Sequence, residues 1–269
     1  TVLYVPQDDR PVSLQYTVDT AREAGMTVLT PPQHLISGKT YQGQADQIMA
    51  WVEQNAGRAD VMVLSTDTLI YGGLVDSRKH NIPLSTLQNR LKRIEGLKAR
   101  NKNVRIYGFG TVMRSPRASG GGTEPAYYAE YGPTIFQIAA LQDKLDSGSL
   151  TQEETQKLMS LQASVPVEYL QDWFDRRQKN MKINKELIDE TRSGVFDYFA
   201  LGHDDTSQLS QSALEGRYLN KYSKDISVEK YGSFPGADQL GLLLMARSRT
   251  DVSTEKPTFS VIYPLGGGG

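Results

Sequence analysis

Carboxylate side chains follow directly after several apolar segments of this 269-residue chain. Because carboxylates repel one another, folding alone does not favour gathering them in one place. In alternating β/α folds, ligands bind at the C-terminal ends of the strands. The pattern therefore predicts an acidic ligand-binding pocket rather than a scaffold feature. The acids are Asp8 and Asp9 after residues 1–6, Asp67 after 59–64, Asp204 and Asp205 after 198–201, and Asp238 after 231–234.

Two of these acids are the candidates for catalysis. Hydrolysis of a glycosidic bond needs two carboxyl groups, one as an acid and one as a base or nucleophile. Asp67 should lie just beyond a buried strand, and Asp205 lies beside a second acid and a histidine. We therefore predict a hydrolase that acts on carbohydrate, with Asp67 and Asp205 as its catalytic pair.

The other polar and aromatic residues near the strand ends are candidates for substrate binding. Arginine and aspartate hold hydroxyls or charged groups by paired hydrogen bonds, and tyrosine rings stack on sugars. Arg114 would balance the acidic charge. A simpler alternative for Asp9 and Asp238 is that each caps a helix. The predicted substrate-binding residues are Asp8, Asp9, Arg10, Thr68, Tyr71, Arg114, Tyr127, His203, Asp204 and Asp238.

Two other functions use the same residues. A hard cation such as Mg²⁺ would suit oxygen ligands and make the chain a metal-dependent hydrolase. Only one histidine lies near the strand ends, and no HExxH spacing occurs, so we predict no metal or other cofactor. A non-catalytic protein that binds a sugar or a cationic ligand is the third possibility. The candidate metal ligands are Asp8, Asp9, His203, Asp204 and Asp238.

The composition excludes several classes of protein. Lysine and arginine total 30 against 31 acidic residues, so no charge excess favours nucleic acid or an anionic membrane. No apolar run approaches the roughly 20 residues of a membrane span. The absence of cysteine excludes disulfides and a thiolate nucleophile, but leaves both an exported and a cytoplasmic location open. The oligomeric state is also open.

Short apolar runs alternate with longer amphipathic stretches, which is typical of β/α units around a mostly parallel sheet. The strands are apolar almost throughout, as expected when both faces of a sheet are covered. No GxGxxG motif follows the first strand, which argues against a dinucleotide site. Strands are predicted at residues 1–6, 26–30, 59–65, 103–110, 197–202, 228–234 and 258–263, and helices at 13–24, 43–56, 84–100, 206–222 and 237–249.

The stretch at about 115–196 interrupts this alternation. A glycine-rich loop at 118–123 precedes three predicted helices, at 133–146, 151–162 and 167–192. We interpret it as a helical insertion in one α/β domain spanning residues 1–265, and expect it to overhang the pocket. The sheet is either doubly wound or an incomplete TIM-like barrel. The four glycines at 266–269 are interpreted as the remnant of a tag or linker.

Five segments together resemble the bacterial family described as domain of unknown function 4127. They are residues 4–11 (YVPQDDRP), 65–74 (STDTLIYGGL), 113–114 (MR), 203–206 (HDDT) and 235–238 (PGAD). They occur in the family's order and spacing and cover nearly the whole chain. Gln7 departs from the apolar residue usual at its position, and His203 from a common glutamine, which weakens His203 as an acid or base. The resemblance supports a site at these segments and implies no particular reaction.

Overall fold

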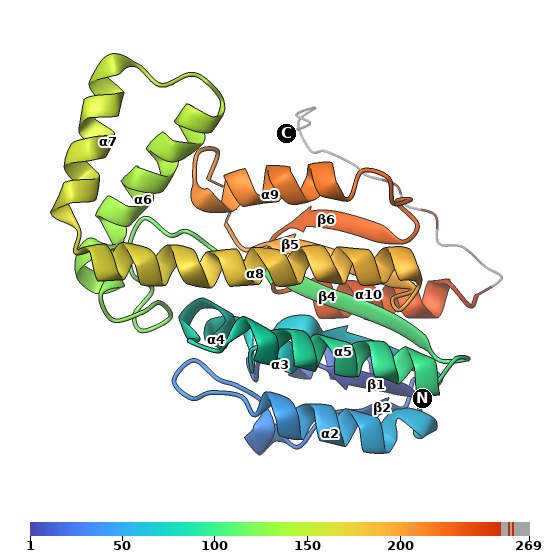
Figure 1. Ribbon diagram of the computed structural model, residues 1–269. Helices are drawn as coiled ribbons and strands as arrows, with labels where there is room; N and C mark the ends of the chain where they lie inside the picture. Colours follow the sequence, from blue (N-terminus) through green and yellow to red (C-terminus); the bar gives the residue numbers. More distant parts are fainter. Residues whose placement is uncertain (206, 254–257, 259, 261–269) are drawn as a thin grey trace.

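The computed structural model describes residues 1–205, 207–253, 258 and 260, which form an open, all-parallel sheet with helices on both faces (Figure 1). The α/β class predicted from the sequence is confirmed. From one edge to the other, the six described strands are β2 (Val28–Leu29), β1 (Val2–Val5), β3 (Val61–Ser65), β4 (Arg105–Val112), β5 (Tyr198–His203) and β6 (Tyr231–Pro235).

The strand order decides between the two predicted architectures. A barrel would place the strands in sequence order, whereas here β1 lies between β2 and β3. The sheet is therefore doubly wound, and the barrel alternative is wrong. In such sheets the chain leaves β1 toward one edge and β3 toward the other. The connections diverge between these two strands and leave a crevice at their C-terminal ends.

Alternating side chains divide the core into two layers. In β1, Leu3 packs into one layer while Tyr4 packs into the other, as the two-residue period of a strand requires. Helices α1 (Gln15–Glu23) and α10 (Leu240–Thr250) cover the face of Tyr4. The opposite face is covered mainly by α2 (Ala45–Asn55), α5 (Leu84–Arg100), α8 (Val167–Ser193) and α9 (Gln211–Tyr222).

The helical insertion is confirmed as three helices, although only part of it stands away from the sheet. Helices α6 (Tyr128–Asp146) and α7 (Gln152–Ser164) pack with the start of α8 around the buried Trp173. A capping box between Thr151 and Glu154 starts α7. The C-terminal half of α8 joins the main core. Figure 1 shows α6 and α7 at the end of the molecule toward which the strands point.

Some predicted boundaries differ from the structure. The helix predicted at 206–222 begins only at Gln211, and the region after β3 contains two short helices that were not predicted. The strand predicted at 258–263 and the glycines at 266–269 lie outside the described residues, except for residues 258 and 260. No helix in the described part of the chain is long and apolar enough to cross a membrane. The remaining short helices are η1 (Gln33–Leu35), η2 (Ala56–Arg58), α3 (Thr66–Ile70) and α4 (Leu74–Lys79).

Candidate functional site

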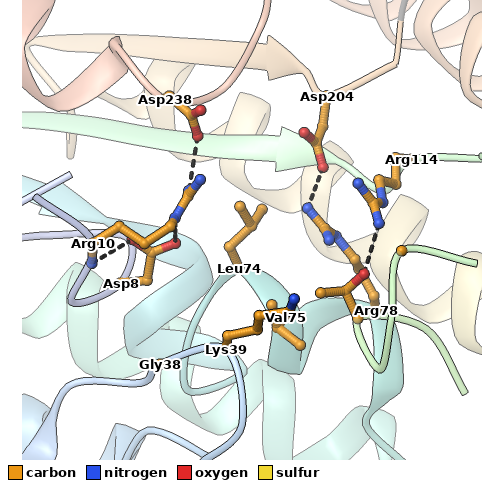
Figure 2. A pocket seen from close by; sticks show the side chains of 12 residues that line it. Asp8, Arg10, Gly38, Lys39, Leu74, Val75, Arg78, Arg114, Asp204 and Asp238 are labelled. Atoms are coloured by element: carbon orange, nitrogen blue, oxygen red, sulfur yellow. Dashed lines mark hydrogen bonds and ion pairs between the residues drawn. The ribbon is translucent and has the colours of Figure 1, made fainter. Parts of the chain in front are cut away.

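A cavity of about 360 Å³ lies at the C-terminal ends of the strands, where the doubly wound sheet leaves its crevice. It is formed by loops that follow β1, β2, β4, β5 and β6, together with α4 (Figure 2). The predicted convergence of separate segments on one pocket is therefore observed for part of the predicted set. The lining residues are Asp8, Arg10, Gly38, Lys39, Leu74, Val75, Arg78, Arg114, Gly120, Thr123, Asp204 and Asp238.

One side of this pocket is a carboxylate–guanidinium–carboxylate cluster. Arg10 donates from Nε to Asp8 at 2.8 Å and from Nη2 to Asp238 at 2.8 Å. The backbone N–H of Arg10 also donates to Asp8, so both oxygens of this buried carboxylate are held. The pair with Asp238 joins the loop after β1 to the loop after β6. Asp238 therefore serves this cluster, and Gln239 rather than Asp238 occupies the N-cap position of α10.

The other side of the pocket contains a second carboxylate–guanidinium pair. Arg78 donates to Asp204, and Figure 2 shows this pair across the cavity from Asp8 and Asp238. Burial raises the pKa of Asp204 although the Arg78 charge opposes that shift. Arg114 lies beside Arg78 but donates to Glu124, from Nε at 2.7 Å. The carboxylate partner of Arg114 is thus Glu124, which does not line the pocket.

The glycine-rich loop closes this side of the pocket. The backbone N–H of Gly120 donates to Glu124 at 2.7 Å, and Lys79 donates to the carbonyl of Gly122 at 2.9 Å. Gly121 and Gly122 have φ angles of 68° and 86°, in the left-handed region that favours glycine. The loop therefore owes its path over the pocket to its glycines and to the Arg114–Glu124 pair.

Asp67, a predicted catalytic residue, is buried and does not line the cavity. Its carboxyl accepts from Thr111 Oγ1 at 2.7 Å and from Gln7 Nε2 at 3.4 Å. Burial raises its pKa to about 6, and the charge of the nearby Asp204 adds to this shift. Asp67 therefore lies in a buried polar layer close to the pocket, and Thr111 orients its carboxyl group.

Asp205, the other predicted catalytic residue, lines a separate depression together with His203. Its two oxygens accept backbone N–H bonds from Ser115 at 3.2 Å and Ser207 at 2.9 Å. His203 shares a 2.7 Å hydrogen bond with Ser233, and burial lowers the pKa of its ring. The structure thus places Asp204 in the main pocket and its neighbour Asp205 outside it.

Four further predicted residues contact protein groups away from the main cavity. Thr68 donates to the carbonyl of Pro6 at 2.6 Å and ties the ends of β1 and β3 together. Tyr71 is buried and stacks on His80. Tyr127 stacks on Tyr169 and donates to Asp172, and Asp9 accepts from Tyr41. None of the four lines the cavity that contains Asp8 and Asp204.

The family is decided by a comparison of the whole sequence with protein-family models. The model described as "Protein of unknown function (DUF4127)" matches residues 2–269. The chain belongs to the DUF4127 family. This confirms the resemblance drawn from the five sequence segments. No curated protein and no solved structure matches the DUF4127 chain.

Sequence reasoning missed several lining residues of the DUF4127 pocket, above all Arg78 and Lys39. Arg78 lies on α4, a six-residue helix too short to show a helical period. Lys39 lies in the loop between η1 and α2, where no acid marks a strand end. For Arg78, the available signal was its proximity in sequence to segment 65–74, which does not extend to Lys39. In the described residues, no group of three or more His, Asp or Glu side chains could hold a metal ion.

Proposed function

We propose that this chain is a hydrolase acting on carbohydrate, and that the pocket between Asp8 and Asp204 is its site. The supporting observation is that carboxylates and guanidiniums alternate around one cavity. A hydroxyl group both donates and accepts hydrogen bonds, whereas a carboxylate accepts and a guanidinium donates. Adjacent hydroxyls of a sugar ring would therefore find partners of both kinds here.

The two carboxylates suit different roles in glycoside hydrolysis. The raised pKa of Asp204 favours its protonated form and so suits it to donate a proton to the leaving oxygen. Asp8, on the opposite side of the cavity, is the candidate for general base or nucleophile, because Arg10 fixes the direction of its oxygens. Asp238 would bind substrate hydroxyls beside it.

This pair replaces Asp67 and Asp205 as the proposed catalytic residues. Asp205 lies outside the cavity and lines a separate depression. Asp67 lacks contact with the cavity, so a role for it would be indirect, through the ordering of the strand ends below Asp204.

The test combines turnover and binding measurements on Asp204→Asn and Asp8→Asn, with a panel of nitrophenyl glycosides as substrates. General acid or base catalysis contributes about 10²–10⁴-fold, so we expect kcat to fall by that range while sugar affinity changes only a few-fold. Asp9→Asn is the matched control, since Asp9 adjoins Asp8 in sequence but does not line the cavity. Thermal unfolding of each variant checks that it folds.

The outcomes separate the three candidate functions. Sugar binding without turnover by the unmodified protein would leave a non-catalytic binding protein. Turnover that disappears with a chelator and returns with Mg²⁺ would favour a metal-dependent hydrolase. If no sugar binds and no glycoside is cleaved, the carbohydrate proposal fails.

A further inference from the structure

The two sides of the pocket carry opposite charge excess. On the side of Asp8, two carboxylates share the single guanidinium of Arg10. On the opposite side, the cations Arg78, Arg114 and Lys39 outnumber the two carboxylates beside them, which belong to Asp204 and Glu124. A neutral sugar would use the acidic side, but it would leave the cationic excess without a partner.

Arg78 is the central residue of the cationic side. It is only 4% exposed, and its Nε has no hydrogen-bond partner among the described residues. Burial lowers the pKa of its guanidinium, and the neighbouring Arg114 charge lowers it further. A buried donor without an acceptor is costly, and a guanidinium beside a second cation adds to that cost. An anion from outside the chain would balance the positive charges that Arg78 and Arg114 place side by side.

Lys39 brings a third cation to the same place. Within the described part of the chain, Lys39 has no ion pair or hydrogen bond. Its Nζ lies 3.9 Å from where a Cβ on Gly121 would stand, and a Cβ on Gly120 would collide with the guanidinium of Arg114. Lys39 and Arg114 therefore approach the glycine-rich loop at adjacent residues. Figure 2 shows the amino group of Lys39 extending toward the side of Arg78.

We propose that the cationic side of the pocket, formed by Arg78, Arg114 and Lys39, binds an anionic group of the substrate, so that the substrate is an acidic sugar. This inference rests on the proposed carbohydrate function and specifies its substrate class. A carboxylate or a phosphate presents several acceptor oxygens, and guanidinium donors match them with charge-assisted hydrogen bonds. The sugar hydroxyls would then face Asp8 and Asp238.

Matched sugars test this proposal directly. Calorimetry would compare glucose, galactose and mannose with their uronic acids, which differ only in the oxidation of C6. Hydrogen bonds to charged groups contribute about 1.5–3 kcal/mol. We therefore expect at least one uronic acid to bind about tenfold or more tightly than its neutral partner. Glucose 6-phosphate tests phosphate as the anionic group, and added NaCl should weaken only the acidic ligands.

Two variants assign the effect to the cationic side. Lys39→Ala changes an exposed residue and should reduce acidic-sugar affinity several-fold more than neutral-sugar affinity. Arg78→Lys retains a charge but loses the planar fork, and should reduce the preference further. Lys102→Ala is the matched control, because Lys102 is an exposed lysine before the N-terminal end of β4, whereas the pocket lies at the C-terminal ends of the strands.

Each result decides a different claim. Tight binding of an acidic sugar that depends on Lys39 supports the proposal. Equal binding of neutral and acidic sugars overturns the acidic-sugar inference while the carbohydrate function stands. An acidic preference that Lys39→Ala leaves intact also overturns it, because the cationic side would then not be its source. Failure of every sugar to bind overturns the carbohydrate function and this inference together.

Discussion

At the scale of single residues, Gly43 holds two loops of the pocket together. A Cβ on Gly43 would overlap the carbonyl oxygen of Gly72, and the N–H of Gly43 donates to Asp76 at 3.0 Å. The loop that carries Lys39 therefore approaches the segment before α4 at backbone contact distance. A larger residue at this position would push Lys39 and α4 apart.

We expect Gly43→Ala to destabilise the protein by roughly 1–3 kcal/mol, as overpacking at a tight contact does. Urea unfolding would measure the loss. Gly57→Ala is the matched control, because a Cβ there meets nothing within 4 Å and φ is not in the left-handed region. Equal stability of the two variants would show that the close approach at Gly43 is not required.

Asp204 and Asp205 show why residue roles were harder to predict than their location. The sequence places both acids at the end of one strand, and the structure agrees. Beyond a strand, however, each side chain takes the direction that its local partners set. Arg78 draws Asp204 into the pocket, whereas two backbone N–H groups hold Asp205 outside it. Of these partners, Arg78 and Ser115 lie far from the two acids in sequence, and only Ser207 is close to them.

At the scale of elements, the sheet was predictable and its accessory helices were less so. Apart from the two-residue β2, the described strands have four to eight mostly apolar residues and are separated by longer amphipathic helices, which leaves a strong pattern in the sequence. The order in which they connect leaves the crevice between β1 and β3. Helices α3 and α4 leave no such pattern, because each has fewer than two helical turns and cannot show a repeat. The pocket residue Arg78 was missed for that reason.

One buried ion pair attaches the insertion to the rest of the fold. Arg177 of α8 is 1% exposed and donates to Glu215 of α9 at 2.7 and 2.8 Å. The same guanidinium donates to the carbonyls of Met113 and Arg114, just after β4. This side chain therefore fixes the segment that carries Arg114 into the pocket.

Breaking this pair should be costly, because the remaining charge would stay buried. We expect Glu215→Gln to lose about 3–5 kcal/mol of unfolding free energy, the usual cost of removing one partner of a buried pair. The double variant Arg177→Met with Glu215→Leu should recover part of that loss, since it buries no charge. Denaturant unfolding of all three proteins measures this. A double variant no more stable than Glu215→Gln would mean that the bonds from Arg177 to the two carbonyls carry the stability.

At the scale of the whole molecule, two buried titratable groups act on stability in opposite directions. His80 donates from Nε2 to Asn180 at 2.8 Å in the neutral tautomer that accepts from the N–H of Ile82, and burial lowers its pKa to about 4. Asp67, in α3 directly after β3, is buried, and this raises its pKa to about 6. In both groups the loss of surrounding water shifts the pKa toward the neutral form.

The signs of the two effects are opposite over the same pH range. The contribution of Asp67 to the free energy of unfolding is present at acid pH. It is lost as the pH rises from about 4 to about 6, because the unfolded chain releases the proton before the folded protein does. The contribution of His80 is present at neutral pH and is lost as pH falls from about 6.5 to about 4. Each effect is on the order of 3 kcal/mol, so the two largely cancel in the intact protein.

Single substitutions should reveal how each group changes the free energy of unfolding with pH, as measured by urea unfolding between pH 4 and 7. Relative to the intact protein, Asp67→Asn should lose stability as the pH falls, because only His80 then responds. His80→Gln should gain stability over the same interval, because only Asp67 remains. The double variant should return to the slope of the intact protein, whatever its absolute stability. If the free energy of unfolding changes with pH in the same way for all four proteins, then neither Asp67 nor His80 changes its protonation on unfolding. These two buried groups would then make no contribution to the pH dependence of stability.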